Sequence, residues 1–575
     1  MLEVIISFIY IAVFCMCTGS GVLKVLGLKL KLGAPGITAR IVTGIITLTV
    51  AVGWISIFAR IGIVVHIVML ILAAASAVYA RDEIRDVIYG FISGIGYADL
   101  IAGAGVLLLI AYAASRGDFH TDTGIYHAAA IRVYEEYGSI TGIVNVQPHY
   151  GYNSSYLGFA ALFTLSRILP YALHTTTGFL MALFTLDVLY HLRDIRTHRS
   201  HVSDAAGIAI ILYVFMNLTG TMSPATDYGT MLMTGYFLCA WLRTAEREES
   251  AGPGCAGAES AECTDIYALL SVYGLFLATM KLSSAMCVLV VILPLIRLIR
   301  DRAWSRIGIY LGLGLFSFLF YIIRNIKQTG WLFYPFESID LFDVEWKFPK
   351  EYSLIDSGQI KVWGRCLFDV DKIDWPVSKW LPIWWEAQEH YDQMLIYALF
   401  IGVLLILVTA VVNKRLRPAY AVFYLMCAAN LAVWFVTAPF IRYGLCFILA
   451  IPLMGISGLA DAVKDSKPHS LIRYVTAASG VLICLCLASR ADHYLMDDLV
   501  FIKHHLADPY YVIQRPFEDV QMGVEYLGDA RVPIYYTDND EEKNSYYTPL
   551  STCYYWMLER VEPMGDTVQD GFKAK

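Results

Sequence analysis

The chain has 575 residues, of which 57% are hydrophobic and only 16% are charged. Soluble domains carry about a quarter charged residues, so this composition excludes an ordinary soluble protein and indicates a polytopic membrane protein. The net charge of −7 is spread over many short loops, which argues against a nucleic-acid partner. The twelve cysteines form no CxxC pair and no Cys/His cluster, so neither a zinc site nor a disulfide framework is indicated.

Apolar runs of membrane-spanning length recur along the chain, and they predict an all-α fold with about 14 transmembrane helices in a domain of residues 1–489. The first run lacks a basic region and a cleavage site, so we interpret it as a retained span. Residues 154–168 are apolar but shorter, and we expect an interfacial or re-entrant helix there. The expected spans lie near 3–22, 41–58, 61–80, 97–114, 173–190, 205–219, 228–243, 265–281, 283–298, 306–322, 393–412, 418–436, 443–461 and 471–488.

Basic residues in the short loops predict one orientation for all these spans. With the expected spans, every basic loop falls on the same side, and the positive-inside rule makes that side cytoplasmic. The loops 115–172 and 323–392 and the region 490–575 then face outward. The basic loop residues are Lys24, Lys29, Lys31 and Arg40, Arg81 and Arg85, Arg193, Arg196 and Arg199, Arg243 and Arg247, Arg297, Arg300, Arg302 and Arg306, Lys414, Arg415 and Arg417, and Lys464, Lys467 and Arg473.

The expected outer regions differ from the inner loops in composition. Seven of the twelve tryptophans lie in 323–392, where they either anchor the loop at the headgroup level or stack against a ring-shaped ligand such as a sugar. Region 490–575 is polar and contains the strand-like stretch 532–537, so we expect a small mixed α/β region on the outer face. The linker 248–263 is expected to be cytoplasmic and disordered.

The stretch 118–155 is the most polar part of the first outer loop. Its segment TDTGIYHAAAIRVYEEYG predicts a short helix that stops at Gly138. Asp118 and Asp122 lie just outside a span, and Asp227 stands in SPATDYG at the start of another. Carboxylates at such a boundary act as a general base or bind a divalent cation, although Asp122 and Asp227 also precede helices and suit N-caps.

Three cations lie at outer span ends, away from the side where cations normally collect. They are Lys281 in MKLS, Arg324 in RNIKQTG and Arg442 in PFIRYG. Snorkelling explains a single cation of this kind, whereas three together favour an anionic ligand at headgroup level, such as a lipid phosphate.

These motifs resemble those of the GT-C superfamily of polytopic glycosyltransferases, and more closely those of an uncharacterised family of bacterial GT-C-like membrane proteins. The resemblance covers most of the chain and rests on the segments DTGIYHAAAIRVYEEYG, GYNSS, SPATD, MKLS, RNIKQTGWLFYP, DVEWKFP, TAPFIRYG and MGDTVQDGF. It implies that Asp122 and Asp227 are the first and second acids of the active site. In GT-C enzymes an acid pair is often adjacent, whereas the nearest partner of Asp122 here is Asp118, four residues away.

The resemblance implies a glycosyltransferase of the bacterial inner (plasma) membrane with an extracytoplasmic active face. The donor would be a polyprenyl-phosphate-linked sugar, and the acceptor a glycan, lipid or protein. Asp122, Asp227 and Asp118 are then the expected catalytic residues, and Lys281, Arg324 and Arg442 the expected donor-phosphate ligands. The expected substrate contacts are His127, Arg132, Asn153 and Trp346.

Two questions about this function stay open at the level of sequence. The first is whether Asp118, Asp122 and Asp227 hold a divalent cation, Mg²⁺ or Mn²⁺; no other cofactor is expected. A lipid-linked glycan flippase or other transporter, and a glycan polymerase or ligase, are the alternatives. Transporters usually place ionisable residues and paired helix breaks at mid-membrane, and the expected spans carry almost no charge in their interiors.

The orientation predicts the outcome of cysteine labelling. In a cysteine-free variant, single cysteines placed within 340–390 or 500–570 are expected to react with membrane-impermeant reagents in intact cells, and cysteines within 195–200 or 248–262 are not. Labelling of the 248–262 linker from outside would reverse the orientation.

Overall fold

The structure is a computed structural model that describes residues 1–116, 120–192, 202–250, 258–413, 417–462, 522–537 and 545–575, together with a few positions between 503 and 512. Asp118, the expected span 471–488 and residues 251–257 of the 248–263 linker lie outside the described residues. The linker was expected to be disordered, but its described residues, 248–250 and 258–263, are helical.

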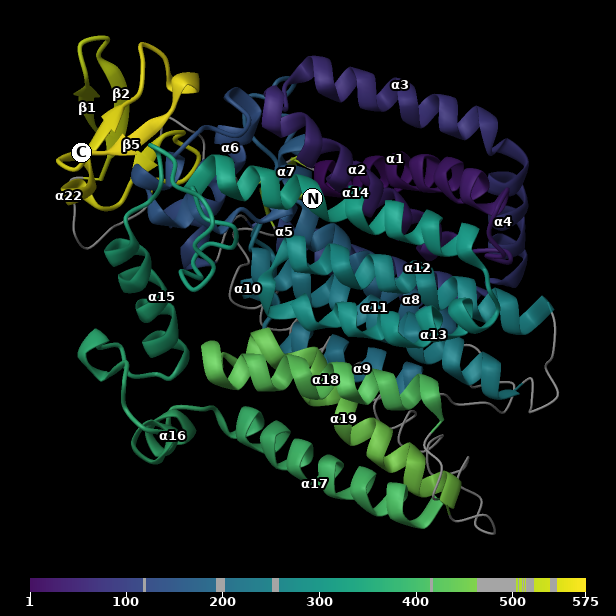
Figure 1. The fold of residues 1–575 in the computed structure, drawn as a ribbon. Helices are drawn as coiled ribbons and strands as arrows, with labels where there is room; N and C mark the ends of the chain where they lie inside the picture. The colour runs from purple at the N-terminus through teal and green to yellow at the C-terminus, as the bar shows by residue number, and fades with distance from the viewer. Residues whose placement is uncertain are drawn as a thin grey trace.

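The fold is mostly helical, and its long helices run alongside one another (Figure 1). The helices up to residue 329 are α1 (Leu2–Gly27), α2 (Ile37–Phe58), α3 (Ile63–Tyr79), α4 (Arg81–Gly94), α5 (Tyr97–Ala114), η1 (Thr123–His127), α6 (Ala128–Glu136), η2 (Ile143–Asn145), η3 (Pro148–Tyr152), α7 (Ser155–Phe163), α8 (Thr176–Leu192), α9 (Val202–Met216), α10 (Leu218–Thr221), α11 (Thr226–Ser250), α12 (Ala258–Met280), η5 (Leu282–Val291), α13 (Ile292–Arg300) and α14 (Trp304–Thr329). They are followed by α15 (Lys350–Gly364), η6 (Val370–Lys372), α16 (Val377–Glu386), α17 (His390–Asn413), α18 (Pro418–Thr437), α19 (Ile441–Ala462), α22 (Tyr555–Leu558) and η8 (Val568–Asp570).

The described residues contain eight helices that are long and apolar enough to cross a membrane, or nine if the bent pair α3–α4 is one span. This is fewer than the 14 spans expected from sequence. Thirteen of the expected segments are helical, but several are too short. Helices α8 and α9 have 17 and 15 residues, about 26 and 23 Å at 1.5 Å per residue, against a hydrocarbon core of about 30 Å.

Burial separates central helices from peripheral ones. In α12, 83% of the apolar window is buried by other helices, compared with 17% in α17. Large apolar side chains of α17, such as Phe400 and Leu404, are more than half exposed. In a chain with this many apolar helices such surfaces face lipid, so sequence hydrophobicity marks both lipid-facing helices and helices buried in the bundle.

The expected helix in the 118–155 stretch is present, but it begins with a π-helical turn, η1, that continues directly into α6. It ends before Gly138, whose φ of +77° lies in the left-handed region where glycine is favoured. The apolar segment that follows was expected to be interfacial or re-entrant. It forms α7, in which all nine residues are buried inside the protein, so it is not an interfacial helix.

Three of the seven tryptophans of the 323–392 region are part of the core, whereas Trp363 is 43% exposed. Trp331, Trp380 and Trp384 are nearly fully buried. The indole N–H groups of Trp331 and Trp384 donate to the carbonyl oxygens of Phe348 and Pro439, at 3.0 and 2.9 Å. A buried indole needs such a partner, and with one it packs as part of the core, so these three rings form neither a membrane belt nor an exposed stacking surface.

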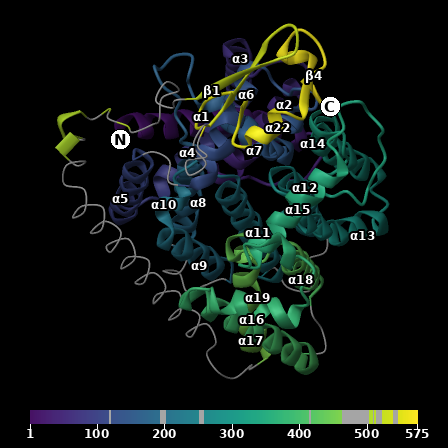
Figure 2. The same cartoon turned by 90° about the vertical axis from the view of Figure 1, so that its left-hand side faces the viewer.

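A small C-terminal β region lies at one end of the long helices, beside α6 (Figures 1 and 2). Its strands are β1 (Gly523–Leu527), β2 (Val532–Tyr536), β3 (Ser551–Thr552), β4 (Val561–Pro563) and β5 (Phe572–Ala574). β1 and β2 form an antiparallel hairpin, β3 adds to β2 in parallel, and β4 pairs with β5. The strand expected at 532–537 is thereby confirmed as β2.

Candidate functional site

The candidate site is built around Asp227, which is 7% exposed and lies in the first turn of α11. Its Oδ2 accepts a hydrogen bond from Nε of Arg442 at 2.7 Å, and its Oδ1 accepts one from Nζ of Lys281. Both carboxylate oxygens are therefore bound by a cation. A buried carboxylate requires such partners, because an unpaired charge in the interior costs several kcal/mol (on the order of 3–5).

Three helix ends supply these groups. Asp227 is at the N-terminus of α11, where the helix dipole favours a negative charge. Lys281 occupies the junction between α12 and η5, and Arg442 is the second residue of α19. Lys281 and Arg442 are 54 and 215 residues from Asp227 in sequence, so their convergence is a property of the tertiary fold.

The ring of Tyr443 lies under both cations. Nζ of Lys281 is 3.6 Å from the ring centroid, and Cζ of Arg442 is 5.1 Å from it. The negative face of the ring favours both positive charges, in addition to Asp227. One carboxylate faces two cations, so these three charged groups leave a net positive charge for an anion.

His120 and Asp122 lie close to the charged cluster. The charges of Asp227, Lys281 and Arg442 act on the pKa values of both groups. Burial lowers the pKa of His120, and its Nδ1 accepts the backbone N–H of Asp122 at 3.2 Å. Burial raises the pKa of the Asp122 carboxyl, and the neighbouring His120 opposes this shift. Asp122 makes no capping hydrogen bond through its side chain, so the N-cap interpretation does not apply to it.

A group of aromatic rings, from His127, Tyr126, His149 and Tyr152, lies next to the His120–Asp122 pair. The ring of His127 lies 6.0 Å from that of His120, and neither of its nitrogens has a hydrogen-bond partner among the described residues. Tyr126 stacks on His149 at 4.9 Å and contacts Tyr152 edge-on at 5.8 Å. Stacked and edge-on rings of this kind form a rigid surface beside the charged groups.

The free space beside Asp227 is small. The cavity bounded by Asp227, Lys281 and Arg442 has a volume of about 10 Å³, room for about one water molecule. A ligand larger than water therefore requires these side chains to move apart.

The third cation expected at this site, Arg324, has different contacts. It is fully buried, its Nε donates to Oδ1 of Asn153, and its Nη2 donates to the carbonyl oxygen of the same residue at 2.9 Å. Asn153 also donates to the carbonyl oxygen of Tyr321 at 3.0 Å. None of these partners is shared with Asp227, so the structure brings Arg324 and Asn153 together with each other and not with Lys281 and Arg442.

Trp346, the remaining expected substrate contact, lies in the 323–392 region, and its hydrogen bonds connect that region to neighbouring backbone. Its indole N–H donates to the carbonyl oxygen of Ile326 at 3.0 Å, and its own carbonyl accepts from the side chain of Asn145 at 3.0 Å. The structure gives it no contact with Asp122 or Asp227.

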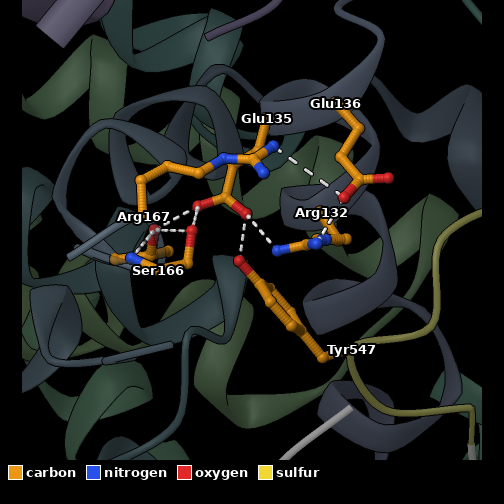
Figure 3. A network of polar contacts seen from close by, with 7 residues as sticks. Arg132, Glu135, Glu136, Ser166, Arg167 and Tyr547 are labelled. Carbon is orange, nitrogen blue, oxygen red and sulfur yellow. Dashed lines mark hydrogen bonds and ion pairs between the residues drawn. The ribbon is translucent and has the colours of Figure 1, made fainter. Parts of the chain in front are cut away.

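Arg132 belongs to a buried polar network centred on Glu135 (Figure 3). The Glu135 carboxylate, 2% exposed, accepts hydrogen bonds from the hydroxyls of Thr164, Ser166 and Tyr547. Arg132 pairs with Glu136 and lies 3.6 Å from Oε2 of Glu135. Burial raises the pKa of Glu135, and the three hydroxyl donors oppose that shift.

The C-terminal segment also contacts the turn that carries the site. The backbone N–H groups of Ser545 and Tyr546 donate to the carbonyl oxygen of Gly124, at 2.7 and 2.8 Å, within η1. With the bond from Tyr547 to Glu135, this segment is joined to both η1 and α6. These contacts fix the turn that follows Asp122.

Sequence reasoning did not assign His120 or Tyr443 to the site. Each has a nearby signal, since His120 is two residues before Asp122 and Tyr443 directly follows Arg442 in FIRYG. No group of three metal-ligating side chains lies together in the described ranges, and both oxygens of Asp227 are bound by cations. The structure therefore offers no preformed metal site among those residues.

The lengths and composition of the helices define a multi-pass membrane protein. The chain belongs to the family of DUF8201, a domain of unknown function, whose match covers residues 1–449. That range includes every residue of the charged cluster. No curated protein and no solved structure matches the chain.

The Glu135 network predicts a role for Tyr547 in holding the C-terminal segment. In Tyr547→Phe a buried carboxylate loses one of its donors, so the free energy of unfolding is expected to fall by about 1.5–3 kcal/mol. Amide hydrogen exchange at Ser545 and Tyr546 should become faster. Tyr555→Phe is the matched control, because Tyr555 is about half exposed, and unchanged exchange in both variants would contradict the prediction.

Proposed function

We propose that the protein is a GT-C-type glycosyltransferase that transfers a sugar from a polyprenyl-phosphate-linked donor to a glycan, lipid or protein acceptor. It acts at the outer face of the bacterial inner membrane. The observation that carries this proposal is the convergence of Lys281 and Arg442 on Asp227, beside the His120–Asp122 pair. A cationic pair next to an available carboxylate is suited to a phosphate-linked donor and a hydroxyl acceptor.

In this proposal the donor phosphate binds between Lys281 and Arg442. The carboxylate of Asp227 already occupies an anion position between these two cations. A phosphate would exchange with it, and Asp227 would turn away as the phosphate enters. This exchange accounts for the small free volume beside Asp227 and for the net positive charge of the three groups. Arg324 would act at a distance, by holding Asn153.

Asp122 is the proposed general base. It takes the proton of the acceptor hydroxyl as that oxygen bonds to the anomeric carbon, and the bond from that carbon to the phosphate oxygen breaks. The electron pair leaves with the polyprenyl phosphate, whose charge Lys281 and Arg442 stabilise. A raised pKa suits a base, since it increases the proton affinity of the carboxylate.

The base assignment predicts that Asp122→Asn abolishes transfer without destabilising the protein, because asparagine keeps the shape and the side chain makes no cap bond. In the parent protein, activity should fall as pH drops through the raised pKa of Asp122, above the usual aspartate range near about 4. Transfer is measured with a radiolabelled donor in proteoliposomes, alongside thermal unfolding. Full activity in Asp122→Asn would exclude it as the base.

The phosphate assignment predicts that Lys281→Gln and Arg442→Gln each weaken binding of a short-chain polyprenyl phosphate by about tenfold to a hundredfold. Binding is measured by calorimetry in detergent. Arg324→Gln is the control, because it should lower the unfolding temperature while leaving the affinity of the folded protein within about twofold.

Asp227→Asn tests the exchange directly. It leaves two cations without their carboxylate, so the unfolding temperature should fall, and polyprenyl phosphate should restore it and bind more tightly than in the parent protein. Weaker phosphate binding in this variant would contradict the replacement of the Asp227 carboxylate by phosphate. It would mean that Asp227 contributes to donor binding instead of competing with it.

A further inference from the structure

A second, larger cavity has a volume of about 770 Å³, and its polar end lies at the other end of the helices from Asp227. It is bounded mainly by apolar side chains, among them Phe8, Ile37, Leu107, Phe179, Leu183 and Leu270. Arg243, at its polar end, is 16 residues after Asp227 on α11, a rise of about 24 Å. The volume falls in the range of about 300–1,000 Å³ that is usual for ligand sites.

Two acidic and two basic side chains lie at the polar end of this cavity and form two ion pairs, and His191 also lines it, with its Nε2 3.7 Å from Oδ1 of Asp187. Nη1 of Arg243 lies 2.7 Å from Oδ2 of Asp187, and Nη1 of Arg247 lies 2.7 Å from Oε1 of Glu262. The net charge of the two pairs is therefore zero, and the polar end as a whole is neutral when His191 is neutral. The cavity combines a long apolar chamber with a polar end that neither attracts nor repels a net charge.

Arg243 retains hydrogen-bonding capacity beyond its pair with Asp187. Its Nε and Nη2 are buried and have no hydrogen-bond acceptor among the described residues. Buried guanidinium N–H groups normally have acceptors, and a phosphate is the acceptor that a guanidinium binds best. The polar end can thus bind a phosphate oxygen through Arg243.

Helix α4 closes one side of the cavity through Val87, Gly90 and Phe91. None of its residues is buried, and the ring of Phe91 stacks on that of Tyr190 at 5.1 Å. The helix is amphipathic, with five charged residues in its first six, and it bends by 78° from α3. A loosely packed amphipathic helix of this kind lies at a membrane surface, where its displacement opens the cavity to lipid.

We infer that this cavity binds a zwitterionic membrane phospholipid. Its hydrocarbon chains occupy the apolar chamber, and its phosphate accepts hydrogen bonds from Nε and Nη2 of Arg243. The neutral balance of the polar end favours a headgroup without net charge over an anionic polyprenyl phosphate. The lipid reaches the site past α4, from the leaflet opposite the one that Asp227 faces. This inference does not depend on the proposed transferase activity.

The test is quantitative mass spectrometry of the lipids that stay bound to the purified full-length protein after exhaustive detergent washing. The expected result is one zwitterionic phospholipid per chain. Leu107→Trp places a larger, rigid ring in the apolar chamber and should reduce the bound lipid about tenfold, since an apolar site tolerates overpacking poorly. Leu108→Trp is the matched control, because Leu108 is the neighbouring residue, is 47% exposed and does not line the cavity.

A second variant tests the headgroup contact without disturbing the fold. Arg243→Lys retains the charge that pairs with Asp187 but loses the planar set of donors, so bound phospholipid should fall while the unfolding temperature holds. Three outcomes would overturn the inference. They are no phospholipid above the level of Leu107→Trp, equal retention by Leu107→Trp and Leu108→Trp, or a polyprenyl phosphate in place of the phospholipid.

Discussion

The structure depends on a buried carboxylate that must be neutralised. Asp227 begins α11, and its two oxygens are bound by Lys281 at the start of η5 and Arg442 at the start of α19. Because an unpaired charge is costly in the interior, this contact holds three helix ends together at one end of the bundle. It also collects two cations where an anion can replace the carboxylate, so the requirement for neutrality and the capacity to bind a ligand arise from the same three residues.

Around this cluster, polar contacts fix loops that apolar packing alone would leave loosely determined. The carbonyl oxygen of Gly124 accepts hydrogen bonds from the backbone N–H groups of Ser545 and Tyr546, and the carboxylate of Glu135 accepts one from the hydroxyl of Tyr547. The C-terminal segment therefore sets the position of the turn after Asp122. Arg324 performs a similar task for Asn153 from inside the bundle. These contacts are directional and join residues far apart in sequence, which makes this end of the protein rigid without disulfides among its described cysteines.

The two ends of the helices therefore differ in chemistry. At one end, charges converge in a space that holds about one water molecule. At the other, an apolar chamber of about 770 Å³ ends in two balanced ion pairs and is closed by the loosely packed α4. The first arrangement suits the exchange of one anion for another, and the second suits hydrocarbon chains with a neutral headgroup. α11 connects them, with Asp227 in its first turn and Arg243 in its C-terminal half.

The sequence alone determined the class of protein, most helix positions, the strand at 532–537 and the separation of polar loops from apolar helices. These follow from composition and local periodicity, which each segment carries by itself. The sequence-based prediction overestimated the number of membrane spans, because a short buried helix such as α9 is as apolar as one that faces lipid. Only the tertiary structure decided that Lys281 and Arg442 share Asp227 while Arg324 binds Asn153. All three cations have the same sequence context, at the end of a span, and the packing of helices distant in sequence determines which partner each one meets.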